Sequence, residues 1–158
     1  MSVSVQESDF DVSAEIDKLC TGRTDIGAIA TFSGVVRGEA HGRALLSMSL
    51  EHYPGMTEDE LSRIETQAQS RFSLMASRII HRVGTLYPGD NIVLVIACAP
   101  HRHDAIAACD FLMDYLKTSA PFWKKETGSD GQGQWVDARA SDDAALGRWL
   151  RNDTAEQV

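Results

Sequence analysis

The chain has 158 residues, of which 43% are hydrophobic and 24% are charged, as in ordinary globular proteins and unlike disordered or fibrous ones. A chain of this length buries roughly two-thirds of its unfolded surface without staples, so we expect one domain at residues 1–150 and a polar C-terminal tail at 151–158. The formal net charge of -8 disfavours proteins that bind nucleic acid or anionic membranes, because those present a basic surface, but it allows a basic pocket on an acidic body.

The cysteines and the apolar runs indicate the cellular compartment. Cys20, Cys98 and Cys109 lie far apart and show no CxxC spacing, which favours a reducing compartment and a role as small buried apolar residues. The N-terminal sequence has no apolar segment typical of a signal peptide, and no later run approaches the roughly 18 residues of a membrane span. We therefore expect a cytoplasmic protein without a membrane-spanning segment.

The first strand and the first two helices are predicted from periodicity. Residues 3–5 alternate as in a short strand. Residues 12–20 are expected to form a short helix with Ile16 and Leu19 on one face, which Ser13 can cap. A second amphipathic helix is expected at 58–71, with Glu65 on its exposed face. Thr57 and Glu60 form a capping box at its start.

Two further alternating segments predict a hairpin. The strands are expected at 26–37, interrupted by Gly34, and at 46–51, where Leu46, Met48 and Leu50 share one face. The polar loop between them forms a mobile tip that carries Arg37, His41 and Arg43. Such a tip fits either a lid for an anion or an ordinary solvated hairpin turn.

A buried strand leads into a basic segment. Strands are expected at 78–83 and at 91–99, and the second is so uniformly apolar that it should be central in a sheet. His101 and Arg102 follow it directly and precede a helix at 104–117, so they either bind phosphate at the helix N-terminus or only begin the helix. A helix of this length separates Arg102 from Lys117 by roughly 20 Å, so the two side chains cannot share a small pocket through the helix itself and need either a long substrate or a second chain.

The segment DYLKTSAPFWKKE, residues 114–126, sets lysines on both sides of an aromatic, proline-containing turn. Pro121 disfavours helical geometry at the residue before it, so the helix should end there and the chain should fold back. Lys117 and Lys124 can then face one pocket. The same pattern also fits a purely structural role, with Lys117 as a favourable C-terminal helix cation and Lys124 and Lys125 in solvent.

The C-terminal region predicts a loop, a strand and a helix. The glycine-rich stretch 127–134 should be a mobile loop, and a strand at 135–138 ends at Arg139. A last helix is capped by Ser141 and buries Trp149, and the tail beyond it is expected to fray.

Five blocks of the chain, taken together and in order, resemble the large catalytic subunit of molybdopterin synthase, the MoaE family. They are LEHYPGMTEDEL, HRVGTLYPGD, PHR, MDYLKTSAPFWKKE and WVDARASDDAALGRW, at residues 50–61, 81–90, 100–102, 113–126 and 135–149. The resemblance implies an α+β fold of the α/β hammerhead type, with a mixed and largely antiparallel sheet and packed helices. It also implies a homodimer with a small ubiquitin-like sulfur-carrier subunit at each end, forming a heterotetramer.

The activity implied by the resemblance is sulfur transfer in molybdenum cofactor biosynthesis. The carrier's C-terminal Gly-Gly thiocarboxylate would enter a pocket of this chain and convert cyclic pyranopterin monophosphate to the dithiolene of molybdopterin, with no cofactor and no metal. Carried over residue by residue, the catalytic lysines are Lys117 and Lys124. The implied substrate-binding residues are Arg37, His101, Arg102, Lys125, Glu126 and Arg139, the last of which would reach the neighbouring protomer's site.

Val35 and Ser119 depart from the family pattern, because many relatives carry a basic residue at each position. These departures remove peripheral charge on the substrate side without changing a predicted catalytic residue. Apolar neighbours are expected to remove Lys117 from water and so suit it to proton transfer. Two other functions stay open: a lysine Schiff-base enzyme acting on a phosphorylated carbonyl compound, and an adaptor that only grips the tail of a ubiquitin-like partner.

Overall fold

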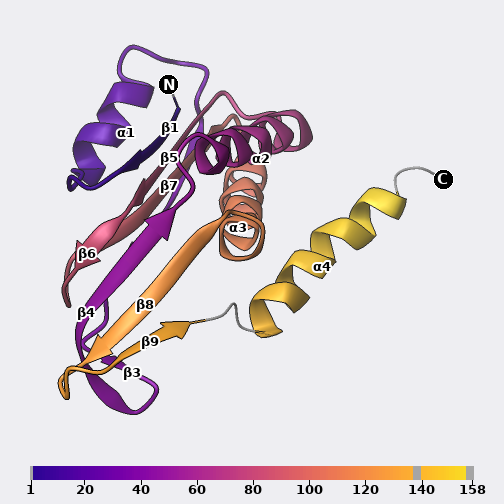
Figure 1. The fold of residues 1–158 in the computed structure, drawn as a ribbon. Helices are drawn as coiled ribbons and strands as arrows, with labels where there is room; N and C mark the ends of the chain where they lie inside the picture. The colour runs from indigo at the N-terminus through magenta and orange to yellow at the C-terminus, as the bar shows by residue number, and fades with distance from the viewer. Residues whose placement is uncertain (1, 137–139, 156–158) are drawn as a thin grey trace.

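A four-stranded sheet forms the centre of the described residues, 2–136 and 140–155 of this computed structural model (Figure 1). Its strands lie in the order β1 (Val3–Gln6), β5 (Ala76–Arg82), β7 (Asn91–Ala99) and β2 (Ala28–Val35). β1 is parallel to β5, whereas β7 is antiparallel to both of its neighbours. Every residue of β7 from Val93 onward is buried, which confirms the predicted central strand.

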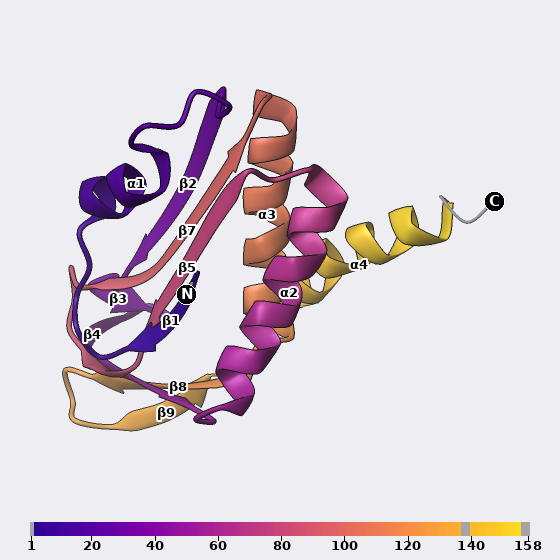
Figure 2. The same ribbon diagram turned by 90° about the horizontal axis from the view of Figure 1, so that it is seen from above.

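Helices cover both faces of this sheet (Figure 2). α2 (Met56–Phe72) and α3 (Arg102–Thr118) pack on one face, against the alternate residues of β7 that begin at Val93. α1 (Val12–Cys20) packs on the other face, against the set that begins at Leu94. Because side chains alternate along a strand, an unbroken apolar run supplies both of these cores.

A second sheet lies at one end of the first. It contains β3 (Glu39–Ala40), β4 (Arg43–His52), β8 (Phe122–Gly128) and β9 (Gly133–Val136), and β6 (Gly84–Leu86) pairs with β4. Its inner face has a small apolar core of its own, made by Val36, Ala40, Leu45, Met48, Leu50 and Leu86. The α+β fold expected from the sequence is therefore confirmed, as two sheets with separate cores.

The predicted hairpin is wrong in its pairing. β2 pairs with β7, and the chain leaves the first sheet after a bulge at Gly34 and Val35. β4 instead pairs with the short β3, through a turn in which His41 and Gly42 both have positive φ. A second bulge in β4, opposite β8, shifts the alternation, so that Leu45 rather than Leu46 is buried. Periodicity could not show these bulges, because it counts residues and not pairings.

The predicted helix caps also change. Asp11, not Ser13, caps α1, because its carboxylate accepts a hydrogen bond of 2.9 Å from the amide of Ala14. α2 begins at Met56, and the carboxylate of Glu58 accepts a 2.6 Å hydrogen bond from the amide of Gly55, which takes a φ of 86° that suits glycine. α1 begins at Val12 as predicted, whereas α2 begins two residues earlier than the sequence indicated.

Glu65 of α2 is buried, contrary to the prediction that it faces solvent. Its carboxylate accepts hydrogen bonds from the hydroxyl groups of Ser2 and Ser77, the latter at 2.9 Å. Gln69 donates to Ser77 at 3.2 Å and extends the network. These bonds offset the cost of burying a carboxylate, and they tie α2 to β1 and β5.

The C-terminal elements extend further than predicted. β8 continues to Gly128 and β9 starts at Gly133, so the loop between them is shorter than the expected 127–134. α4 (Ala140–Ala155) continues into the predicted tail, and its Trp149 packs edge-on against Phe72 and Phe111. Arg139 and the side chain of Ser141 lie outside the described residues.

The cysteines are free, as expected, with Cys98 and Cys109 buried and Cys20 half-buried. Burial raises the pKa of the Cys98 thiol to about 12 and that of Cys109 to about 11, so both stay protonated at neutral pH. Within the described ranges, no helix has the length and apolar character needed to cross a membrane.

Candidate active site

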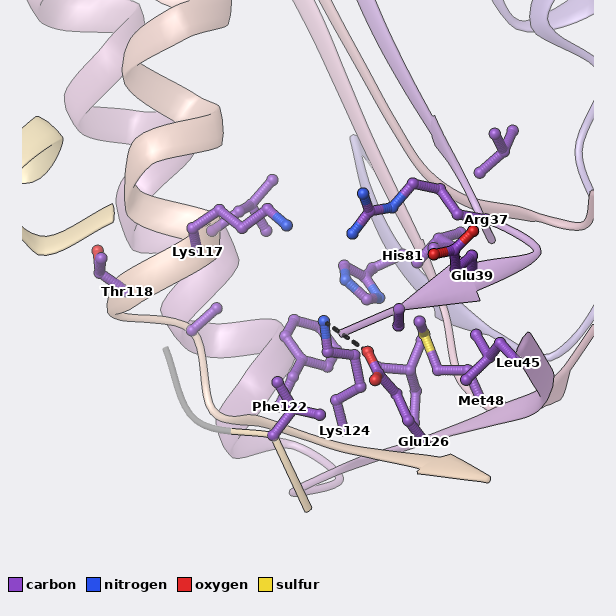
Figure 3. A pocket seen from close by; sticks show the side chains of 17 residues that line it. Arg37, Glu39, Leu45, Met48, His81, Lys117, Thr118, Phe122, Lys124 and Glu126 are labelled. Carbon is purple, nitrogen blue, oxygen red and sulfur yellow. Dashed lines mark ion pairs between the residues drawn. The ribbon is translucent and has the colours of Figure 1, made fainter. Parts of the chain in front are cut away.

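A cavity of about 470 Å³ lies where the end of α3 meets the second sheet (Figure 3). Its walls come from residues far apart in the sequence: the end of β2 and the chain after it, the strands β3, β4, β8 and β9, one residue each of β5 and β7, and the last turn of α3. Arg37, Lys117, Lys124 and Glu126 all line it. The expectation that Lys117 and Lys124 face one pocket is therefore confirmed.

The end of α3 places Lys117 at the cavity. The helix ends at Thr118, and Pro121 then begins a reversal into β8, as the sequence predicted. The buried hydroxyl of Thr57 at the start of α2 donates a 3.1 Å hydrogen bond to the carbonyl oxygen of Pro121 and fixes the turn. Lys117 itself is exposed, so the chain alone does not remove its ammonium from water as expected.

Lys124 and Glu126 share the inner face of β8, because they are two residues apart on a strand. Lys124 Nζ lies 3.9 Å from Glu126 Oε1, and His41 Nε2 lies 3.6 Å from Glu126 Oε2. Glu126 is 4% exposed, and its Oε2 has no hydrogen-bond donor among the described residues. This carboxylate therefore both pairs with the lysine and keeps an acceptor at the cavity wall.

Arg37 reaches the cavity from the opposite side. The preceding residue, Val36, is held by two backbone hydrogen bonds to the turn after β6: its amide donates to Asp90 and its carbonyl accepts from Gly89. In Figure 3 the guanidinium of Arg37 and the ammonium of Lys117 point toward each other across the cavity. Cations from two different parts of the chain thus face the same space, as an anionic ligand requires.

The other basic residues of the predicted lid do not join Arg37 in this cavity. Arg43 Nη1 lies 3.6 Å from Asp130 Oδ1, which turns its charge toward the β8–β9 loop. His41 contacts Glu126 but is not part of the cavity wall. The tip forms a hairpin turn, and His41 lines a second, more open hollow there together with Arg37.

Several predicted substrate-binding residues lie elsewhere in the described chain. His101 and Arg102 are exposed at the far end of α3, as its length required. Lys125 lies on the other face of β8, where its ammonium is 5.8 Å from the centre of the Trp135 ring. Arg139 falls outside the described residues. The cavity of one chain therefore unites only part of the predicted set.

His81 lines the cavity and was missed by the sequence analysis. It lies on β5, paired with Val93, and its ring stacks on Phe122 with centroids 3.8 Å apart. One feature of the sequence could have pointed to His81. It is a titratable side chain two residues after Ile79, so the two share the face of the strand that the helices cover. The approach of Phe122 is a tertiary contact that no local pattern contains.

Burial lowers the pKa of His81 to about 4, a hydrogen bond to the carbonyl of Arg82 opposes this shift, and the nearby charges of Lys117 and His52 add to it. The ring is therefore neutral at physiological pH. In the unfolded chain its pKa is about 6.5, so only the unfolded state takes up this proton as the pH falls from 6.5 toward 4.

We expect His81 to make the fold less stable in mild acid. Relative to the His81→Phe variant, the free energy of unfolding of the unmodified chain should fall by about 2–3 kcal/mol between pH 7 and pH 4.5. Urea unfolding of both proteins at the two pH values measures this difference, and the other titrating groups cancel in the comparison. Parallel pH dependence of the two proteins would show that His81 titrates normally.

No group of three or more His, Cys, Asp or Glu side chains is arranged to hold a metal ion within residues 2–136 and 140–155. The charged side chains at the cavity are instead two ammonium groups and one guanidinium, which bind anions, beside the carboxylates of Glu39 and Glu126. The chemistry that this arrangement supports is the binding of negatively charged reactants and the stabilisation of negative charge that develops between them.

Comparisons with known proteins identify the family of this chain. The family model described as "MoaE protein" matches residues 5–119. The chain is 55% identical to the molybdopterin synthase catalytic subunit of Rhizobium meliloti over 96% of this chain and 97% of that protein.

Solved structures give the same result. The fold is similar to the molybdopterin biosynthesis MoaE protein of Burkholderia ambifaria, with a TM-score of 0.80 and 51% identity over 94% of this chain and 97% of that one. It is also similar to a molybdopterin synthase structure from Staphylococcus aureus, with a TM-score of 0.77 and 26% identity over 84% of this chain and 94% of that one. The chain belongs to the MoaE protein family.

Proposed function

We propose that this chain is the catalytic subunit of a cytoplasmic molybdopterin synthase. It transfers sulfur from the thiocarboxylated C-terminus of a small ubiquitin-like carrier to cyclic pyranopterin monophosphate, and the product is the dithiolene of molybdopterin. The observation that carries this proposal is the convergence of Arg37, Lys117 and Lys124 on one cavity, in a member of this family.

The charges of the cavity match the charges of the reactants. The precursor brings a cyclic phosphate and the carrier brings a thiocarboxylate, so two anions must approach each other in one small space. Arg37 can bind phosphate oxygens through two parallel N–H groups. Lys117 and Lys124 then neutralise the thiocarboxylate and the charge that develops on its carbonyl oxygen.

Each sulfur transfer replaces one carbon–oxygen bond of the pterin side chain with a carbon–sulfur bond, and it breaks the bond between sulfur and the carrier's carbonyl carbon. Water supplies the new oxygen atom of the carrier's C-terminus, which becomes an ordinary carboxylate. We assign Lys117 to the thiocarboxylate carbonyl and the reacting carbons, and Lys124 to charge stabilisation or proton donation. Glu126, 3.9 Å from Lys124 Nζ, orients that lysine.

The assembly we propose is a homodimer with one carrier bound to each protomer. His101 and Arg102 lie a full helix away from Lys117, so they can bind substrate only at a site completed by a second chain. We assign Arg139 to the neighbouring protomer's site, as the resemblance to the family implies. Lys125 contributes at the edge of that site.

A reconstituted single-turnover reaction tests this function. The chain is mixed with thiocarboxylated carrier and cyclic pyranopterin monophosphate, and the dithiolene product is detected by mass spectrometry. Product formation supports the synthase. A stable complex with the carrier that yields no product would instead favour an adaptor, and a lysine adduct trapped by borohydride on a phosphorylated carbonyl compound would favour a Schiff-base enzyme.

A further inference from the structure

The hydrogen bond of His81 fixes which of its ring nitrogens carries the proton. Nδ1 lies 2.8 Å from the carbonyl oxygen of Arg82. A carbonyl oxygen only accepts hydrogen bonds, so Nδ1 must be the donor, and in the neutral ring Nε2 is left as an acceptor. Within residues 2–136 and 140–155, the structure shows no hydrogen bond to Nε2.

The ring plane is fixed as well as the tautomer. His81 stacks on Phe122 with 18° between the ring planes. Phe122 follows directly on the turn at Pro121 that Thr57 holds, so the stacking partner is itself fixed. Figure 3 shows the ring between the groups that reach the cavity from Arg37 and from β8. Nε2, the nitrogen farther from the backbone, is the polar atom that His81 brings to this space.

The neutral acceptor Nε2 of His81 binds a different kind of ligand group than the cations do. Arg37, Lys117 and Lys124 attract phosphate and thiocarboxylate groups, whereas a nitrogen lone pair repels them. The group that Nε2 can satisfy is an N–H or O–H. Glu126 Oε2, which also has no hydrogen-bond donor among the described residues, is a second acceptor on the same cavity wall.

We propose that His81 is a positioning residue that accepts a hydrogen bond, at Nε2, from an N–H or O–H group of a reactant bound beside Lys117. The inference rests on the proposed function for the identity of the reactants. The donor comes either from the ring or hydroxyl groups of the pterin precursor or from a backbone amide of the carrier's C-terminus.

Three substitutions separate the acceptor from the stacking. His81→Gln places an amide oxygen near the position of Nε2 and keeps an acceptor there. His81→Asn is too short to reach that position but can still donate a hydrogen bond to the Arg82 carbonyl. His81→Phe keeps the stacking on Phe122 and removes both polar atoms. Circular dichroism and thermal unfolding establish that each variant is folded before it is compared.

The affinity of each variant is measured separately for the two reactants. Equilibrium dialysis gives the affinity for the pterin precursor, and calorimetry gives the affinity for the carrier with an ordinary C-terminal carboxylate. We expect His81→Phe and His81→Asn to lose about 3- to 10-fold in affinity for one reactant, the value of one hydrogen bond, and His81→Gln to recover most of it. The reactant that loses affinity identifies the source of the donor.

Unchanged affinities in His81→Phe for both reactants would overturn the proposal, and so would a His81→Gln variant as weak as His81→Phe. Both affinities can be measured whether or not product forms. Failure of the proposed function, seen as no product with the unmodified chain, is therefore distinguishable from failure of the role assigned to His81.

Discussion

Replacing Lys117 by alanine is expected to slow dithiolene formation by about 10²- to 10⁴-fold in the single-turnover reaction, the range for loss of a positioned general acid or base. Lys117 is the cation that the end of α3 projects into the cavity, opposite Arg37. Its removal leaves the anionic reactants with less charge compensation at the reacting carbon atoms. Rapid quenching followed by mass spectrometry measures the rate.

Lys18→Ala is the matched control for Lys117→Ala. Lys18 is also a lysine in the last turn of a helix, but it lies on α1, on the opposite side of the central sheet, with 69% of its side chain exposed. The control should react at the rate of the unmodified chain. Near-normal sulfur transfer by a folded Lys117→Ala protein would remove Lys117 from the mechanism.

A third variant, Lys117→Arg, distinguishes the two roles that a lysine can have here. Arginine keeps the positive charge but does not give up a proton at accessible pH. Substantial recovery of the rate in Lys117→Arg would show that Lys117 acts as a fixed charge. A rate as low as that of Lys117→Ala would show that proton transfer, or the compact shape of the ammonium, is required.

The largest effect on stability is expected from Phe111→Ala, which should lower the free energy of unfolding by about 3–5 kcal/mol. Phe111 is 2% exposed and forms the junction of three helices. Its ring lies 5.4 Å from Phe72 of α2, 4.6 Å from Tyr115 of its own helix and 5.4 Å from Trp149 of α4. Truncation removes these contacts and leaves a cavity that rigid neighbours cannot fill.

Urea unfolding followed by circular dichroism measures the loss, with Ile106→Ala as the control. Ile106 is on the same helix but is 60% exposed, so its truncation should change the free energy of unfolding by less than about 0.5 kcal/mol. Similar destabilisation of the two variants would contradict the role given to the aromatic junction, because alanine is a strong helix former and neither change lowers the helix propensity of α3.

Local patterns predicted the elements of this fold well and their pairing poorly. The apolar run of β7 and the stripe of α3 placed both elements correctly, because burial on two faces or on one stripe leaves a direct trace in the sequence. The partner of β2 leaves no such trace. The bulge at Gly34 and Val35 redirects the chain into the second sheet. Its direction there depends on the backbone hydrogen bonds between Val36 and the turn at Asp90, which a local pattern does not contain.

The site was predictable to the extent that one local segment builds it. Lys117 and Lys124 flank a single turn, so the sequence alone brought them together. Arg37 was assigned by resemblance, and its place opposite Lys117 depends on contacts between distant strands. His81 was missed because a histidine in a strand is an ordinary core residue until its neighbours are known.

The cavity lies between two apolar clusters, one under the helices and one inside the second sheet, which meet at the partly buried Ile92. Such clusters can open separately, so the amide protons of β4 and β8 can exchange with solvent through an opening that leaves β7 closed. A reactant held between Lys117 and Lys124 binds only when both clusters are closed. Its binding therefore makes the opening of either cluster less frequent by the same mass-action factor. Substrate binding therefore joins two units of local unfolding into one cooperative unit.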